Sequence, residues 1–221
     1  MKRSDSVDAD LPDLSRLCYN ATKAIVAKEN ANTMNTPSQS LATAAAALPP
    51  NGFPASVNLM LNLGHAIDHM FLLIFATAVS AIALEFGFKN WTDLMPYSVG
   101  AFALFGLGAL PAGRLGDLWG RRSMMVVFFV GMGVSAMLVA LTQNHWQLAA
   151  ALTLMGAFAA IYHPVGIPML VQNVPNPGAV IGLNGLVGNL GIACAAVVTG
   201  FLVKWIGWRA AFAIPGVVSL V

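Results

Sequence analysis

The sequence predicts an all-α membrane protein, a bundle of six helices of which the sixth is incomplete. Hydrophobic residues make up 57% of the 221 residues, charged residues only 9%, and the mean hydropathy is +0.73. Apolar stretches recur along the chain, each close to the ~20 residues that cross a bilayer. We therefore expect a chain that crosses a membrane repeatedly rather than one that folds around a soluble core.

Residues 1–55 are expected to form a flexible cytoplasmic tail. They are polar and alanine-rich and end in Leu48-Pro49-Pro50-Asn51-Gly52, a composition typical of disordered segments. A polar, acidic stretch follows Met1-Lys2-Arg3 where a signal peptide would be apolar. Apolar residues at helical spacing from Leu11 to Ile25 also allow a short amphipathic helix on the membrane surface.

Residues 56–221 are expected to form the transmembrane six-helix bundle. A sixth apolar stretch begins at Ala210 and stops after about a dozen residues, so we expect the chain to end inside a helix. The five stretches before it are 58–84, 94–112, 124–141, 148–171 and 179–203.

The distribution of lysine and arginine predicts which loops face the cytoplasm. Of the six Lys and Arg residues after position 50, three are Arg114, Arg121 and Arg122, between the second and third stretches. Cytoplasmic loops are enriched in these residues, so the N-terminus is also assigned to the cytoplasm. Lys204 and Arg209 are an exception, because they flank a loop that this topology places outside.

A glycine-rich basic stretch dominates the loop between the second and third helices. It reads Gly113-Arg114-Leu115-Gly116-Asp117-Leu118-Trp119-Gly120-Arg121-Arg122 and is expected to be a short hairpin. Its glycines would let a neighbouring backbone approach closely. Asp117 could accept from free backbone donors at the start of the next helix, and Arg121 and Arg122 could anchor that helix at the anionic leaflet.

This stretch resembles motif A of the major facilitator superfamily, the signature of the loop between transmembrane helices 2 and 3. Leu118 stands where the family usually has arginine. The matching positions are Gly113, Leu115, Gly116, Asp117, Gly120, Arg121 and Arg122. The resemblance implies the N-terminal six-helix half of a twelve-helix transporter, paired with a C-terminal half absent from this sequence or with a second copy. It also implies a conformational switch, formed by Gly113, Asp117, Gly120, Arg121 and Arg122.

The first apolar stretch carries three polar side chains on one helical face. His65, Asp68 and His69 are spaced so that a helix aligns them. A charged aspartate at the bilayer centre costs on the order of 2.5–3.5 kcal/mol, so Asp68 is expected to face the bundle interior. The fourth stretch contains His163, followed by Pro164. Counting ~1.5 Å per residue from the middle of each stretch places Asp68 and His163 at the same depth.

The resemblance places the first and fourth helices on a central cavity, so Asp68 and His163 are predicted to face each other or a shared substrate. A carboxylate and an imidazole can exchange a proton, and imidazole titrates close to physiological pH. Asp68 is therefore predicted to couple transport to protons, with His65, His69 or His163 as relays or substrate contacts. The alternative is that the histidines only hydrogen-bond neighbouring helices and that Asp68 is a neutral buried acid.

Structural roles are expected for the remaining polar and helix-breaking residues. Glu85, at the outer end of the first helix, is expected to be a solvated cap. Pro164 and Pro168 free backbone carbonyls and can bend the fourth helix. A glycine-rich face of the fifth helix predicts close packing, with amides that bond across it. Its residues are Gly182, Gly185, Gly188 and Gly191, with Asn184 and Asn189 between them.

The sequence therefore predicts a secondary active transporter in a bacterial inner membrane that moves a small organic solute by alternating access. Proton coupling is expected and efflux is favoured. Its expected partners are the lipid bilayer, the solute and protons. The sequence shows no metal-ligand cluster, nucleophile motif or phosphate loop, so we expect no enzyme, cofactor, metal site or nucleic-acid partner.

A different class of function is also compatible with the sequence, a non-transporting membrane sensor or scaffold that recruits a partner through the tail. Within the superfamily, the Gly64-His65 and His163-Pro164 pairs are similar to those of the fosmidomycin-resistance-like branch.

Overall fold

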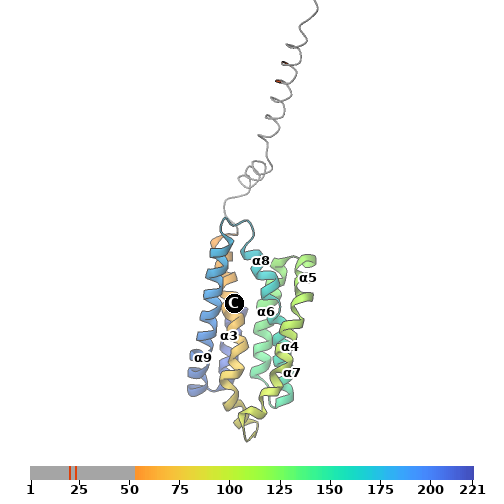
Figure 1. Ribbon diagram of the computed structural model, residues 1–221. Helices are drawn as coiled ribbons and strands as arrows, with labels where there is room; N and C mark the ends of the chain where they lie inside the picture. Colours follow the sequence, from red (N-terminus) through yellow and green to blue (C-terminus); the bar gives the residue numbers. More distant parts are fainter. Residues whose placement is uncertain (1–19, 21–22, 24–52) are drawn as a thin grey trace, which may run out of the picture. The chain divides into compact units, whose positions relative to one another are not determined.

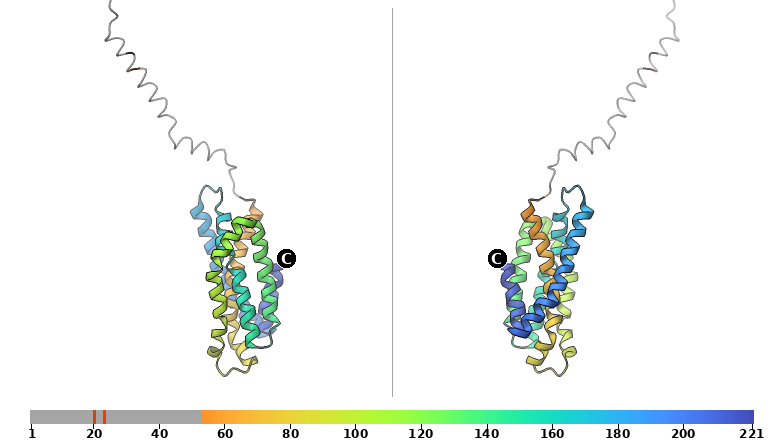
Figure 2. Two further views of the ribbon diagram at one scale, coloured as in Figure 1. Left: turned by 90° about the vertical axis from the view of Figure 1, so that its right-hand side faces the viewer. Right: turned by 90° about the vertical axis from the view of Figure 1, so that its left-hand side faces the viewer.

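The computed structural model describes residue 20, residue 23 and residues 53–221, and the last of these ranges forms the bundle (Figure 1). The predicted tail, with its amphipathic helix, lies outside the described residues apart from a few positions. The described bundle is helical from end to end, and Figure 2 shows its helices running side by side in two further views.

Eight α-helices and three short helical turns make up the described bundle. The first are α3 (Ala55–Glu85), the 3₁₀ turns η1 (Trp91–Asp93) and η2 (Met95–Ser98), α4 (Val99–Leu107) and α5 (Ala109–Trp119). They are followed by α6 (Arg121–Ala140), α7 (His145–Ala159), the π-helical turn η3 (Tyr162–Gly166) and α8 (Ile167–Leu170). The last are α9 (Pro177–Trp205) and α10 (Trp208–Leu220).

Four of the described segments are long and apolar enough to cross a membrane, namely α3, α6, the run from α7 to α8, and α9. Two further helical parts, 91–107 and 109–119, meet at an angle of 46° and make a fifth such segment if they are counted as one span. Helix α10 has 13 residues and ends about midway along the bundle (Figure 2). The prediction of an all-α membrane bundle with a short sixth helix is confirmed. The predicted stretches coincide with these segments to within three residues, except that the second continues to Trp119, beyond its predicted end at 112.

Glycine residues set how closely the helices approach. Helix α3 lies along α9 (orange and blue in Figure 1), while α7 packs against α4 and α6. A Cβ on Gly191 of α9 would collide with the backbone of Ala66 in α3. Gly188 lies against the ring of His65, whereas a Cβ added to Gly182 or Gly185 would meet no neighbouring element within 4 Å. The prediction of a closely packed glycine face is therefore confirmed for Gly188 and Gly191, which contact α3. It is not confirmed for the two earlier glycines among the described residues.

The stretch predicted to be a hairpin is mostly helical, so that prediction is wrong. Helix α5 continues to Trp119 and α6 begins at Arg121, which leaves Gly120 alone to make the turn, with a φ of 88°. Glycine adopts this left-handed conformation without a steric penalty. Asp117 does not cap α6 either. It lies within α5 and pairs with Arg121 at 3.4 Å, because the helix runs past it.

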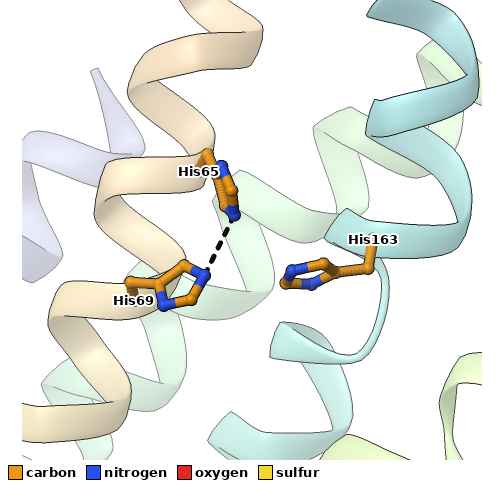
Figure 3. A group of neighbouring side chains, drawn as sticks. All are labelled: His65, His69 and His163. Atoms are coloured by element: carbon orange, nitrogen blue, oxygen red, sulfur yellow. Dashed lines mark hydrogen bonds between the residues drawn. The ribbon is translucent and has the colours of Figure 1, made fainter. Parts of the chain in front are cut away.

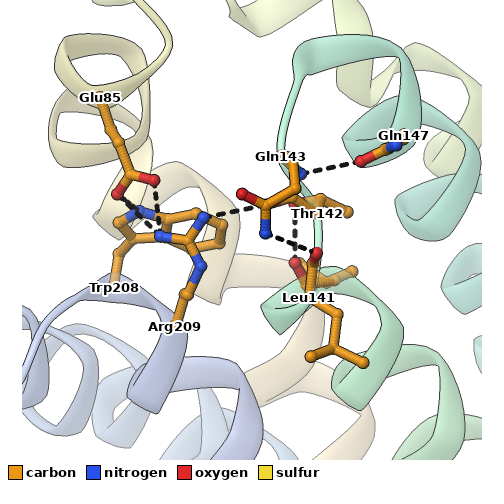
Figure 4. Close-up of polar contacts among 8 residues, drawn as sticks. Glu85, Leu141, Thr142, Gln143, Gln147, Trp208 and Arg209 are labelled. Atoms are coloured by element: carbon orange, nitrogen blue, oxygen red, sulfur yellow. Dashed lines mark hydrogen bonds and ion pairs between the residues drawn. The ribbon is translucent and has the colours of Figure 1, made fainter.

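A cluster of polar contacts joins the end of α3 to the start of α10 (Figure 4). Glu85 accepts hydrogen bonds from Arg209 Nη1 at 2.6 and 2.8 Å and from Trp208 Nε1 at 2.7 Å. Arg209 Nη2 donates to the backbone carbonyl of Thr142 at 2.9 Å. Glu85 is exposed at the end of α3, as predicted, and its carboxylate also balances the charge of Arg209, a partner that the sequence did not indicate. Arg209 is one of the two basic residues that do not fit the predicted distribution of Lys and Arg, and the pairing with Glu85 neutralises its charge.

We expect Glu85→Gln to lower the free energy of unfolding by about 1 kcal/mol, because both partners of the ion pair are partly exposed. The amide keeps the size of the side chain and removes its charge. Thermal unfolding in one detergent measures the change, with Asp93→Asn as the control at an exposed acid. Equal midpoints for the two variants would show that the contacts of Glu85 add no stability.

Candidate functional site

Three histidine rings converge between α3 and η3 (Figure 3). His65 and His69 lie one turn apart on α3, and His163 faces them from η3. The Nε2 atoms of His65 and His69 are 2.9 Å apart. The ring centroid of His163 lies 5.2 Å from that of His65 and 5.7 Å from that of His69. The three residues can each offer a nitrogen within 4.8 Å of the other two.

Asp68 is the buried acid of this group. Its exposed fraction is 0%, and its Oδ2 atom lies 3.6 Å from His163 Nδ1, within ion-pair range but too long for a good hydrogen bond. Neither carboxylate oxygen has a hydrogen-bond partner. Among the described residues, no lysine or arginine forms an ion pair with it. A buried carboxylate left unpaired is costly, so this position requires a proton or a cation close by.

The orientation of His65 is fixed from two sides. Its Nδ1 atom lies 2.8 Å from the backbone carbonyl oxygen of Asn184, which can only accept, so Nδ1 carries the proton. In the neutral ring, Nε2 then has a free lone pair and accepts from His69. The ring of Tyr162 stacks on His65 with centroids 4.9 Å apart and an angle of 11° between the planes.

Tyr162 and Asn184 link α3, η3 and α9 through buried hydrogen bonds. The Tyr162 hydroxyl donates to the carbonyl of Leu61 at 2.7 Å and accepts from Asn184 Nδ2 at 2.9 Å. The same amide donates to Asn62 Oδ1 at 3.1 Å. The sequence predicts that amides of the fifth membrane helix, α9, hydrogen-bond to neighbouring helices. This is confirmed for Asn184, whereas Asn189 is exposed. The network holds the elements that carry the histidines in one arrangement.

The π-helical turn η3 determines where His163 lies. Such a turn inserts one extra residue into a helix and is frequent at functional sites. Pro164, next to His163, has no backbone donor to contribute to the helix. Helix α5 packs against this turn, since a Cβ on Gly113 would lie 3.3 Å from Pro164 and one on Gly116 would lie 2.9 Å from Val165. The glycines of the motif A stretch therefore contact the turn that carries His163.

The structure brings together all four of the residues that the sequence singled out for chemistry, Asp68, His65, His69 and His163. The depth predicted for Asp68 and His163 agrees with their contact. Sequence reasoning missed Tyr162 as a member of the site, although a tyrosine inside an apolar helix signals a buried hydroxyl that needs a partner.

Comparisons with a family profile and with individual relatives agree with one another. A family profile described as Major Facilitator Superfamily matches residues 61–221. The probable actinorhodin transporter of Streptomyces coelicolor is 33% identical over 123 residues, which cover 53% of this chain and 21% of that protein. The tetracenomycin C resistance and export protein of Streptomyces glaucescens is 29% identical over 132 residues, covering 58% and 24%.

A third relative is the puromycin resistance protein of Streptomyces alboniger, which is 30% identical over 108 residues, covering 48% of this chain and 22% of that protein. The matched regions span between 21% and 24% of the length of these three relatives. All three names describe transport or resistance.

Proposed function

Because the chain belongs to the major facilitator superfamily, we propose that it forms the N-terminal six-helix half of a secondary active transporter for a small organic solute. The family match and the apolar helices make it an integral, multi-pass membrane protein. In this proposal residues 1–55 are a cytoplasmic tail, residues 56–221 form the bundle, and the protein lies in a bacterial inner membrane.

Transport would proceed by alternating access. This half would rock against a second six-helix half, supplied by further sequence or by a second copy, around a site near the middle of the membrane. The observation that carries the proposal is the group formed by Asp68 and the three histidines inside an otherwise apolar bundle. Ionisable residues are rare in transmembrane helices and commonly mark substrate or ion pathways.

Protons are the proposed coupling ion, with Asp68 alternating between its protonated and ionised forms. Its nearest base is His163, 3.6 Å away, and the hydrogen-bonded pair of His65 and His69 offers further sites for a proton. The direction proposed is efflux, which is supported by the names of two relatives, one for the export of tetracenomycin C and one for resistance to puromycin.

The proposal is tested by expressing the complete transporter, this half together with its second half, in a bacterial strain that lacks its main drug efflux pumps. The probe is a fluorescent aromatic antibiotic, and its accumulation in cells is followed with and without a protonophore, against an empty-vector control. We expect lower accumulation with the protein, reversed by the protonophore. Equal accumulation in both strains would contradict efflux of this class, and efflux that persists after the proton gradient is collapsed would contradict the coupling.

We further propose that Gly113, Asp117, Gly120, Arg121 and Arg122 act as a conformational switch. The ion pair of Asp117 and Arg121 supports this role, as does the packing of Gly113 against the turn that carries His163.

Removing the Asp117 carboxylate should shift the balance between the two facing states without abolishing solute binding. An exposed pair contributes up to about 1 kcal/mol, so we expect Asp117→Ala to change the ratio of the states by up to about fivefold. Accessibility of a single engineered cysteine from each side of the membrane measures that ratio, with Arg114→Ala, an exposed position of the same helix, as the control. Loss of binding in Asp117→Ala would contradict the proposed switch.

A further inference from the structure

We propose that His65, His69 and His163 form a binding site for one divalent transition-metal ion such as Zn²⁺, with Asp68 as a positioning residue. Figure 3 shows the three rings converging on one space between α3 and η3. No metal site is expected from the sequence, which shows no metal-ligand cluster. The fold supplies the third ligand, His163.

The positions of the nitrogen atoms suit a metal ion. His65 and His69 are four residues apart on one helix, the spacing at which two histidines of a helix bind zinc, and a third ligand commonly comes from another segment. Zinc–nitrogen bonds of about 2.0–2.1 Å place two tetrahedral ligands about 3.3 Å apart. The Nε2 atoms of His65 and His69, now 2.9 Å apart, would separate slightly, and His163 would turn inward from within 4.8 Å.

His65 already has the kind of partner that a metal ligand uses, and His163 lies close to one. A ligating histidine usually donates its second N–H to a carbonyl or a carboxylate, which fixes the ring and its tautomer. His65 Nδ1 donates to the carbonyl of Asn184 at 2.8 Å, and His163 Nδ1 lies 3.6 Å from the carboxylate of Asp68. Nε2 of both rings is therefore left to face an ion.

The charges of the site also favour a cation. Asp68 is fully buried, and no lysine or arginine pairs with it in the described part of the chain. A divalent ion on the histidines would place positive charge close to this carboxylate. Three neutral imidazoles are ligands that zinc, copper, nickel and iron accept, and they leave a coordination position open for water or for an oxygen atom of a solute.

This metal site goes beyond the transport proposal, and its test measures the binding of a metal ion rather than the transport of a solute. Purified protein without a histidine tag is titrated with ZnCl₂ against a chromophoric chelator, and separately with CoCl₂ while the visible absorption of Co²⁺ is recorded. We expect one equivalent of Zn²⁺ per chain and the spectrum of Co²⁺ bound by nitrogen ligands. A protein that binds neither ion would overturn the metal site and leave the transport proposal standing.

Variants assign the binding to these residues. The affinity should fall by about 10–100-fold in Asp68→Asn, the loss typical of a partner that orients a ligand, and by more in His69→Ala and His163→Ala. His145→Ala is the matched control, because His145 is the remaining histidine of the sequence and lies at the start of α7, against Phe88 and Tyr97.

Folding of each variant is checked by thermal unfolding without metal, and His69→Gln serves as a second variant where His69→Ala is unstable. A Zn²⁺ affinity in the His69 and His163 variants equal to that of His145→Ala would place the ion elsewhere and overturn the assignment.

Discussion

Asp68→Asn should abolish the accumulation of solute driven by a proton gradient while leaving solute exchange intact. Asparagine keeps the shape of the side chain but cannot change its charge, so the proposed alternation between protonated and ionised forms is lost. For one proton exchanged per solute, a gradient of one pH unit corresponds to about 1.4 kcal/mol and a tenfold concentration ratio. We expect that ratio to fall to about one in the variant.

Proteoliposomes that contain the complete transporter give this measurement, with an imposed pH gradient and, separately, with solute exchange at equal pH. Asp93→Asn is the control, because Asp93 is an exposed acid in η1 and should keep the tenfold ratio. An unchanged ratio in Asp68→Asn would mean that another group carries the proton, and loss of exchange as well would mean that Asp68 is needed for binding or folding.

Gly191→Ala should destabilise the bundle strongly, whereas Gly182→Ala on the same helix should not. The new methyl group at position 191 would collide with the backbone of Ala66, which cannot move without shifting α3. Overpacking of this kind costs about 1–3 kcal/mol or more. At position 182 nothing lies within 4 Å, and replacing a helical glycine by alanine stabilises a helix by up to about 1 kcal/mol.

The comparison is made by thermal unfolding of both variants in the same detergent. Opposite shifts of the unfolding midpoint are expected, downward for Gly191→Ala and unchanged or upward for Gly182→Ala. Two equal shifts would contradict the close contact between α9 and α3. Because Gly188 lies against His65 on the same face, a displaced α9 should also weaken the bond between Asn184 and His65.

The sequence predicts those parts of the fold that depend on composition and on helical period. The length of the apolar stretches predicted the membrane helices, and a spacing of four residues predicted that His65 and His69 lie side by side on one helix. Depth along the membrane followed from the rise per residue, so the contact of Asp68 with His163 could be anticipated.

The sequence was less informative about which neighbouring helix a given side chain faces. Whether His163 points at the other histidines depends on η3, and no residue pattern in Tyr162–Gly166 specifies a π-helical turn. Four equally spaced glycines on α9 give no sign that only Gly188 and Gly191 meet α3. Pairing between the ends of helices that are distant in the chain is equally hidden, which is why the partner of Glu85 was missed.

Because the chain is synthesised from its N-terminus, two contacts of α3 must wait for partners that are made much later. His65 binds a residue 119 positions later in the chain, and Glu85 binds one 124 positions later. At about 5–20 residues per second, the ribosome needs roughly 6 to 25 s to add the missing partner of Glu85. Until then the newly made α3 holds its acids and histidines in the bilayer without these partners. Among the described helices, α3 is made first, but it completes these polar contacts only after α9 and α10 have been made.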